Sequence, residues 1–394
     1  MRWATQVPLA WKNLTHNTRR LATAIAGIMF AVILMFVEQG FENALLDSTV
    51  YVIEDLNADL VLYSPGKYLF EAPHRFDRRQ LLQAETHPLV TRTYPFYVEV
   101  GQSSLKRVGH RSYPIRVLAF DVNRRLCNFK GVDQNAPLLQ KPRTAIIDIK
   151  SKADAYKAVP LSDPQQLPEI RAELAGKQLQ IVGTFSLGTD FANEGTMIMA
   201  PKNFARYFPY RDRGSDPLSQ VDVGLIQIRK DADPAQVRDE LVKFLPKHIE
   251  VKIKRDYVQN EKTFWSTSTP VGYIFRMGVV LGFVVGTVIC YQIIFANIND
   301  HQSEFATLKA MGYPPRFFIQ VVLGKSFYLS VLGFLPGWLV TWIIFWGLSS
   351  GTGLHMDLRY DRVAIIYLLT LGMCFLSGCF AIWKVLKLEP AELF

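Results

Sequence analysis

Long uncharged apolar runs near both ends of the chain enclose a polar middle. A helix needs about 20 consecutive apolar residues to cross a bilayer, and four runs meet or approach that length. They cover residues 21–37, 277–299, 326–356 and 363–383, the third preceded by a shorter apolar stretch at 317–324. The pattern therefore predicts four transmembrane helices, with a large polar insertion after the first.

The insertion mixes strand patterns, which are short and alternating, with helical ones. Strands are predicted at 58–63, 116–120, 144–149, 178–185, 221–228 and 249–254, and helices at 78–85, 201–208 and 234–244. Asp233 is suited to cap the last helix, with Pro234 at its first position. Because strands and helices follow in irregular order, we expect an α+β domain, of two subdomains, with 160–168 as the main internal loop.

Basic residues beside the apolar runs indicate the orientation, because cytoplasmic flanks are enriched in Lys and Arg. In the short flanks, only Arg359 and Arg362 fall on the side of the insertion, beside Asp357 and Asp361. Nine basic residues fall on the other side: Arg2, Lys12, Arg19, Arg20, Lys309, Arg316, Lys325, Lys384 and Lys387. We therefore expect a multi-pass inner-membrane protein with both termini cytoplasmic and an extracytoplasmic, periplasmic α+β domain inserted between helices 1 and 2.

Composition limits the function classes. Hydrophobic residues make up 49% and charged residues 20%, with a mean hydropathy of +0.10. Residues 38–268 hold 32 Lys or Arg and 29 Asp or Glu, so the net charge of +9 resides mostly outside the insertion. This excludes a plain cytosolic enzyme and a compact many-helix channel. Arg19-Arg20 also resembles the start of a twin-arginine signal peptide, but no A-x-A cleavage site follows, so we expect the first run to be retained.

Residues that could carry chemistry are scattered in the insertion. Its histidines show no metal-ligand spacing, and no G-x-S-x-G nucleophile motif occurs. Cys127 is the single cysteine between the first two runs, so no disulfide is expected there. We expect no catalytic residue, no metal and no cofactor in this chain. Two arginine pairs could bind acidic groups, but we interpret them as solvated loop charges: Arg124 with Arg125, and Arg211 with Arg213.

The second apolar run carries small residues on one helical face, at Gly278, Gly282 and Gly286, and Cys290 continues the stripe. Small residues let membrane helices approach closely. Two interpretations remain open from the sequence, packing within one chain and packing between subunits.

Two basic residues lie near the ends of spans. We expect Arg276 and Lys325 to extend toward the membrane interface. Gly324-Lys325-Ser326 matches the end of an ATP-binding P-loop, but Ile319 stands where the motif requires glycine. The chain is therefore not expected to bind ATP by that route.

Two cytoplasmic elements are predicted. Trp11, Lys12 and Leu14 suit a short amphipathic helix at the membrane interface. Residues 304–311 suit two helical turns between the second and third spans, with Gly312 as the residue after the C-cap. A short helix fixed between two spans can transmit force from a partner.

The last of these elements resembles a known family. The sequence E-F-A-T-L-K-A-M-G at 304–312 is similar to the E-x-G-x-L-K-A-x-G stretch of FtsX/MacB-type (type VII) ABC transporter permeases, although Ala306 replaces the first glycine. The closing P-A-E at 390–392 and A-W-K-N-L at 10–14 also resemble that family. S-T-P-V-G at 268–272, Y-Q-I at 291–293 and D-H at 300–301 resemble the DevC group of cyanobacterial exporters.

The resemblance implies a permease homodimer in membrane lipid, working with an ABC ATPase subunit that holds the ATP and Mg. It further implies a periplasmic membrane-fusion protein and a TolC-like outer-membrane channel as partners, and no nucleic acid. ATP-driven motion would be coupled to the outer domain by mechanotransmission, exporting a lipid or glycolipid-like cargo. Coupling to the ATPase is expected at Glu304, Phe305, Leu308, Lys309, Met311 and Gly312.

The resulting domain plan runs from end to end of the chain. It comprises a cytoplasmic amphipathic helix at 1–18, a first span with stalk extension at 19–44, a MacB-like domain at 45–262, a stalk and second span at 263–298, a coupling helix at 299–316, a third span at 317–348, a periplasmic loop at 349–362, a fourth span at 363–384 and a tail at 385–394.

Two other functions remain possible from the sequence. An FtsX-like regulator would transmit the motion of the ATPase to a periplasmic cell-wall hydrolase without moving cargo. A membrane-bound enzyme is the weaker alternative, because the insertion has no catalytic constellation.

Overall fold

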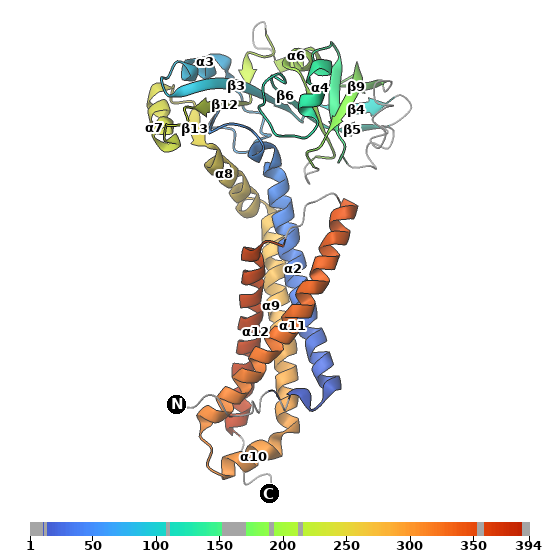
Figure 1. The fold of residues 1–394 in the computed structure, drawn as a ribbon, viewed down its shortest axis with the longest axis vertical. Coiled ribbons are helices and arrows are strands. Elements are labelled where there is room, and N and C mark those ends of the chain that lie inside the picture. The colour runs from blue at the N-terminus through green and yellow to red at the C-terminus, as the bar shows by residue number, and fades with distance from the viewer. Residues whose placement is uncertain are drawn as a thin grey trace. The chain divides into compact units, whose positions relative to one another are not determined.

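The computed structural model describes residues 11, 14–107, 111–151, 171–188, 193–211, 216–352 and 358–387. The chain forms two compact units, and Figure 1 shows the ribbon of both. The helical unit comprises residues 1–44, 270–351 and 356–394, and the inserted domain comprises residues 45–269 with 352–355. The second unit thus begins where the sequence places the insertion and ends seven residues beyond the predicted limit of 262.

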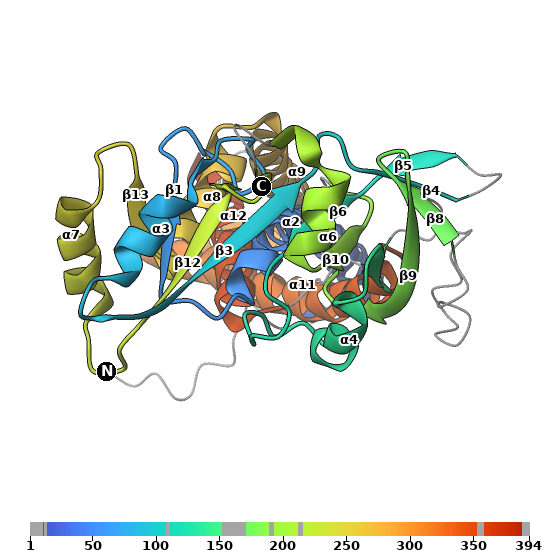
Figure 2. The same cartoon turned by 90° about the horizontal axis from the view of Figure 1, so that it is seen from above.

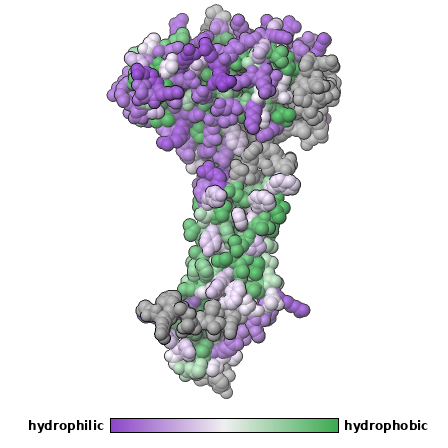
Figure 3. Space-filling view, in the orientation of Figure 1, coloured by the Kyte–Doolittle hydropathy of each residue, from purple (hydrophilic) through white to green (hydrophobic). Residues whose placement is uncertain are grey.

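Four long helices build the helical unit: α2 (Thr18–Glu54), whose residues 45–54 belong to the inserted domain, α9 (Pro270–Asp300), α11 (Pro315–Thr352) and α12 (Tyr360–Lys387). Within the described residues, these four are long and apolar enough to cross a membrane. In Figure 1, α2, α9 and α12 run lengthwise and α11 crosses them obliquely, and Figure 3 shows many hydrophobic residues on the surface of this unit. The prediction of four transmembrane helices, with the α+β domain between the first and second, is confirmed.

Helix α2 packs closely on α11 through glycines of α11. A Cβ added at Gly333 would lie 2.4 Å from Cγ2 of Ile28, and one added at Gly337 would lie 2.8 Å from Cγ1 of Val32. Both α2 side chains are fully buried. Glycine has no side chain, so a branched side chain of the neighbouring helix can occupy the space beside it. Membrane helices commonly associate in this way.

The inserted domain contains a mixed sheet of eleven strands. In chain order these are β1 (Leu60–Tyr63), β3 (Val90–Glu99), β4 (Ser104–Arg107), β5 (Ser112–Pro114), β6 (Arg116–Ala119), β7 (Thr144–Asp148), β8 (Arg171–Leu174), β9 (Lys177–Phe185), β10 (Thr196–Met199), β12 (Val223–Ile228) and β13 (Glu250–Ile253). Their order in the sheet is β13-β1-β12-β3-β6-β10-β7-β9-β8-β4-β5. A separate pair joins β2 (Phe76–Asp77) and β11 (Gln220–Val221).

Both faces of the sheet are covered, because successive side chains of each strand point to opposite sides. Leu60 and Leu62 of β1 face the hydrophobic cluster under α3 (Arg78–Glu85), α6 (Pro201–Tyr207) and α7 (Pro234–Phe244). Val61 and Tyr63 face the cluster shared with α4 (Val132–Leu139), α8 (Lys254–Thr267) and residues 50–53. The predicted cap of α7 is present, since Asp233 Oδ1 accepts from the Ala235 amide at 3.2 Å.

Strand β3 joins the two halves of the sheet. Residues 90–96 pair with β12, and residues 97–99 pair with β6. Figure 2 shows β3 crossing the domain between α3 and α6. We expected two subdomains, but residues 45–269 form one compact unit because this single long strand belongs to both halves. The predicted loop at 160–168 lies outside the described residues.

Candidate functional site

The predicted coupling segment folds as helix α10 (Gln302–Ala310), between α9 and α11 at one end of the helical unit (Figure 1). Its C-terminus closes as the sequence predicts. The amide of Gly312 donates to the Lys309 carbonyl at 3.0 Å, and that of Tyr313 donates to the Leu308 carbonyl at 3.2 Å. Gly312 has φ of +88°, a conformation that favours glycine, and Pro315 then begins α11.

One face of α10 is anchored in the helical unit. Phe305 and Ala306 are buried, and the Phe305 ring lies 6.0 Å from that of Phe318 in α11. The ammonium of Lys325, also in α11, lies 5.5 Å over the Phe305 ring. Phe305 therefore holds α10 in place and is not available for direct contact with a partner.

The other face of α10 is accessible. Glu304, Met311 and Gly312 are exposed, while Leu308 and Lys309 are half-buried. Nδ1 of His301 lies 3.0 Å from Oε1 of Glu304. Of the six predicted coupling residues, Phe305 thus anchors the helix, and the other five lie on or beside the accessible surface.

Thr307 and Tyr313 complete that surface, and the sequence-based prediction missed both. The spacing of 304, 307 and 311 is the spacing of one helical face, which is the signal that could have identified Thr307. Below, "the α10 face" means Glu304, Thr307, Met311 and Tyr313.

The N-terminal element lies against α11. The Trp11 ring is 5.2 Å from that of Tyr328, and Leu14 is buried. The Thr15 hydroxyl donates to the Trp11 carbonyl at 3.0 Å. Lys12, predicted as part of the same helix, lies outside the described residues.

The glycine stripe of α9 faces neighbouring helices of the same chain. A Cβ at Gly278 would lie 2.4 Å from Cδ of Glu38, and one at Gly282 would lie 2.9 Å from Cγ of Met35. At Gly286 it would lie 2.5 Å from Sδ of Met373 in α12. Of the two interpretations, the structure therefore presents packing within one chain.

The expectation for Lys325 is wrong. Its side chain does not extend to the membrane interface but is buried, with 1% of the residue exposed. Its ammonium donates to Oδ1 of Asn297 in α9 at 2.5 Å. Lys325 turns inward because the side chains that its ammonium contacts, Asn297 and Phe305, lie in α9 and α10.

The expectation for Arg211 is also wrong, since this residue is not a solvated loop charge but is fully buried in the inserted domain. Its guanidinium pairs with Asp222 and lies 3.2 Å from Oε2 of Glu99. Arg75 approaches the same two carboxylates, at 3.3 Å from Glu99 and 3.1 Å from Asp222. Arg124 and Arg125 are exposed as expected, and Arg213 lies outside the described residues.

The inserted domain offers no metal site among the described residues, where no group of three His, Cys, Asp or Glu side chains converges. Burial raises the pKa of Glu261 in α8 to about 7, although its carboxylate accepts from the Phe70 amide and the Trp265 indole. Burial also lowers the pKa of Lys67 to about 8, and its ammonium donates to the Ala72 carbonyl. Both groups serve the packing of one loop against α8.

The comparisons agree with a permease. Residues 276–390 match the family model of the FtsX-like permease C-terminal domain. The lipoprotein-releasing system transmembrane protein LolC of Xylella fastidiosa, in strains Temecula1 and 9a5c, is 21% identical over 140 residues. The match covers 29% of this chain and 33% of each relative, so it spans about a third of the length of these curated relatives.

Two solved structures resemble part of the chain. The periplasmic region of MacB from Actinobacillus actinomycetemcomitans is 10% identical, with a TM-score of 0.35, covering 52% of this chain and 94% of that one. The extracellular domain of the transporter YknZ from Gram-positive bacteria is 12% identical, with a TM-score of 0.34, covering 50% and 98%.

Four apolar helices with a short helix between the second and third define a multi-span membrane protein of the permease class. Residues 276–390 are similar to the FtsX-like permease C-terminal family, in agreement with the resemblance of the sequence motifs to FtsX/MacB-type ABC transporter permeases. Proteins of this family are membrane subunits of ABC transporters.

Proposed function

We propose that this chain is the permease subunit of an ABC exporter, driven by a separate ATPase subunit that docks on the α10 face. The observation that carries this proposal is the construction of α10. One side is anchored by buried Phe305 and Ala306, while the other presents exposed Glu304, Thr307 and Met311. A push on that face is passed to α9 and α11, because α10 connects the C-terminal end of α9 to the N-terminal end of α11.

The cargo that we propose is a lipid or glycolipid-like molecule. It is handed to a periplasmic membrane-fusion protein and a TolC-like outer-membrane channel, and the permease works as a homodimer in the inner membrane. The motif resemblance to the DevC group supports this, as does a relative named for lipoprotein release. The basic flanks of the spans support cytoplasmic termini and a periplasmic inserted domain.

A second candidate is an FtsX-like regulator that passes the same motion to a periplasmic cell-wall hydrolase. The match to the FtsX-like permease C-terminal model supports it; this match covers most of α9 together with α10, α11 and α12, and leaves out α2 and the inserted domain. The two candidates share the ATPase and the α10 face. They differ only in what the inserted domain contacts.

Affinity purification of the tagged full chain from gently solubilised membranes, with mass spectrometry of its partners, separates the candidates. An ATP-binding subunit together with a membrane-fusion protein is the expected result. An ATP-binding subunit with a wall hydrolase would replace export by regulation. Recovery of the chain without any ATP-binding subunit would overturn both.

A further inference from the structure

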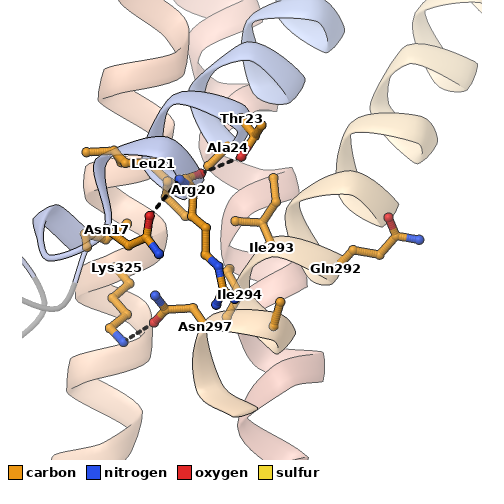
Figure 4. Close-up of a pocket in the computed structure, with 13 residues that line it drawn as sticks. Asn17, Arg20, Leu21, Thr23, Ala24, Gln292, Ile293, Ile294, Asn297 and Lys325 are labelled. Carbon is orange, nitrogen blue, oxygen red and sulfur yellow. Dashed lines mark hydrogen bonds between the residues drawn. The ribbon is translucent and has the colours of Figure 1, made fainter. Parts of the chain in front are cut away.

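A cavity of about 340 Å³ lies at the α10 end of the helical unit, between α2, α9 and α11. Figure 4 shows the residues that line it. Much of the wall is apolar, including Leu21, Ala24 and Leu329. The cavity reaches the outer surface of the helices at Thr23 and Ala296, two lining residues that are exposed. It is therefore open toward the side where lipid surrounds a membrane protein.

Two cations line this cavity, and their charges are balanced differently. Arg20 forms an ion pair with Asp300, and both side chains are substantially exposed. Lys325 is 1% exposed, and its ammonium contacts Asn297 and the Phe305 ring, neither of which is charged. Among the described residues, that ammonium forms no ion pair with a carboxylate; Glu304 acts on its charge only from a distance, and the Glu304 carboxylate contacts His301. Lys325 is thus a buried cation that no contact ion pair neutralises.

A buried charge is costly unless an opposite charge compensates it, and inside a membrane protein such a charge marks a candidate binding site. The partner that fits must be acidic at one end, to meet Lys325 and Arg20. It must be apolar beyond that, to lie along Leu21 and Leu329. An acidic phospholipid has this chemistry, whereas free phosphate would leave the apolar wall uncovered.

We propose that this cavity binds the headgroup of an anionic phospholipid, with a phosphate oxygen on the Lys325 ammonium and the start of an acyl chain along the apolar wall. By the charge distribution of the flanks, this end of the helices faces the cytoplasm, so the lipid comes from the inner leaflet. The same ammonium lies over Phe305, the anchor of α10, so an occupant would contact the residue that holds this helix. The proposal does not depend on the ATPase or on export.

The test uses the full-length chain in detergent, mixed with phosphatidylglycerol and phosphatidylcholine of the same acyl chains, and counts retained lipids by native mass spectrometry. We expect the wild-type chain to retain phosphatidylglycerol about tenfold better. Lys325→Gln can still donate to Asn297 and should remove that preference. Arg276→Gln is the matched control, because it removes an exposed cation from α9 outside the cavity and should leave the preference unchanged.

A second variant keeps the test decisive if Lys325→Gln does not fold. Ala296→Trp fills the cavity from an exposed position, so it should abolish retention without disturbing the core. Equal retention of both lipids by the wild type would overturn the proposal, as would an unchanged preference in both cavity variants. If inorganic phosphate alone displaces phosphatidylglycerol and stabilises the chain against heat as well as the lipid does, the site takes a free anion and the lipid assignment is wrong.

Discussion

At the scale of single residues, the charges buried in the inserted domain decide its stability. Arg211 satisfies three acceptors at once, namely the Val98 carbonyl at 3.0 Å, Glu99 and Asp222. Its guanidinium also lies 4.8 Å over the Phe204 ring, so it is packed as well as paired. The partners lie in β3 and just after β11, which makes this cluster a link between elements distant in sequence.

Replacing Arg211 by Met should destabilise the inserted domain by about 3–5 kcal/mol, because two buried carboxylates then share only Arg75. Thermal unfolding of the full chain, followed by the loss of sheet signal in circular dichroism, measures the change. Arg125→Met is the matched control, since that side chain is 86% exposed and should change the free energy of unfolding little. Equal melting of both variants would refute this assignment.

Glu261 should make the stability of the inserted domain dependent on pH. Burial raises its pKa from 4.5 to about 7, so between these values the folded chain binds a proton that the unfolded chain releases. The contribution of Glu261 to stability is therefore fully present below about pH 4.5 and is lost as the pH rises through about 7, a change of at most about 3 kcal/mol. Glu261→Gln should flatten the difference in unfolding free energy between pH 5 and pH 8, whereas exposed Asp239→Asn should not. A Glu261→Gln variant with the wild-type pH dependence would show that another group titrates.

At the scale of elements, glycines on α9 set how closely the spans pack. Gly286 meets both Met373 of α12 and Ala31 of α2, at 2.5 and 2.8 Å from an added Cβ. Gly372 in α12 has open space by comparison, since an added Cβ would lie 3.8 Å from Phe283. The two positions form a matched pair within one interface.

Gly286→Ala should therefore destabilise the helical unit by about 1–3 kcal/mol, the usual cost of overpacking. Gly372→Ala should be neutral or slightly stabilising, because it improves helix propensity without a clash. Thermal unfolding in detergent, with the helical signal as the readout, compares the two variants. Equal stability of the two would mean that α9 and α12 separate easily at Gly286.

Lys309 tests the function of α10. It lies in the last helical turn, where a cation favours the helix dipole, and it borders the α10 face. Lys309→Glu should uncouple ATP hydrolysis from the work of the inserted domain while leaving assembly intact. ATPase activity and transport, measured together in proteoliposomes that contain the partner subunits, are the readouts. Unchanged transport by the variant would count against the coupling role.

Elements with a regular pattern could be predicted from the sequence, and those fixed by distant contacts could not. The helices at 78–85 and 234–244 were predicted with the observed bounds, because caps and periodicity are local signals. Strands β3 and β10 were missed; in β3, Pro95 interrupts the strand pattern. The burial of Arg211 could not be predicted from the sequence either, because its partner Glu99 lies 112 residues away.

The candidate site divides in the same way. The glycine that ends α10 is a local property, and the sequence predicted it, although the helix begins at Gln302 and not at the predicted residue 304. Which face of α10 is anchored depends on Phe318 and Lys325, which belong to the following span. The sequence therefore located the element but could not separate Phe305 from the accessible residues around it.

At the scale of the whole molecule, the chain combines four spans, an inserted domain with two covered faces, and one short helix with an accessible face. The central claim is that an ATP-binding subunit docks on the α10 face. In the proposed assembly the motion that reaches the other partners begins at that contact, because ATP is expected to bind to the separate subunit.

The most direct test is photocrosslinking in living cells, with a photoreactive amino acid placed at Met311 of the full chain. Met311 is 62% exposed and lies on the α10 face. Tyr360, at the start of α12 and 94% exposed, is the control position. The account predicts a crosslink to an ATP-binding subunit from Met311 and none from Tyr360. The absence of that subunit from the Met311 crosslinks, or its equal capture from both positions, would contradict the account.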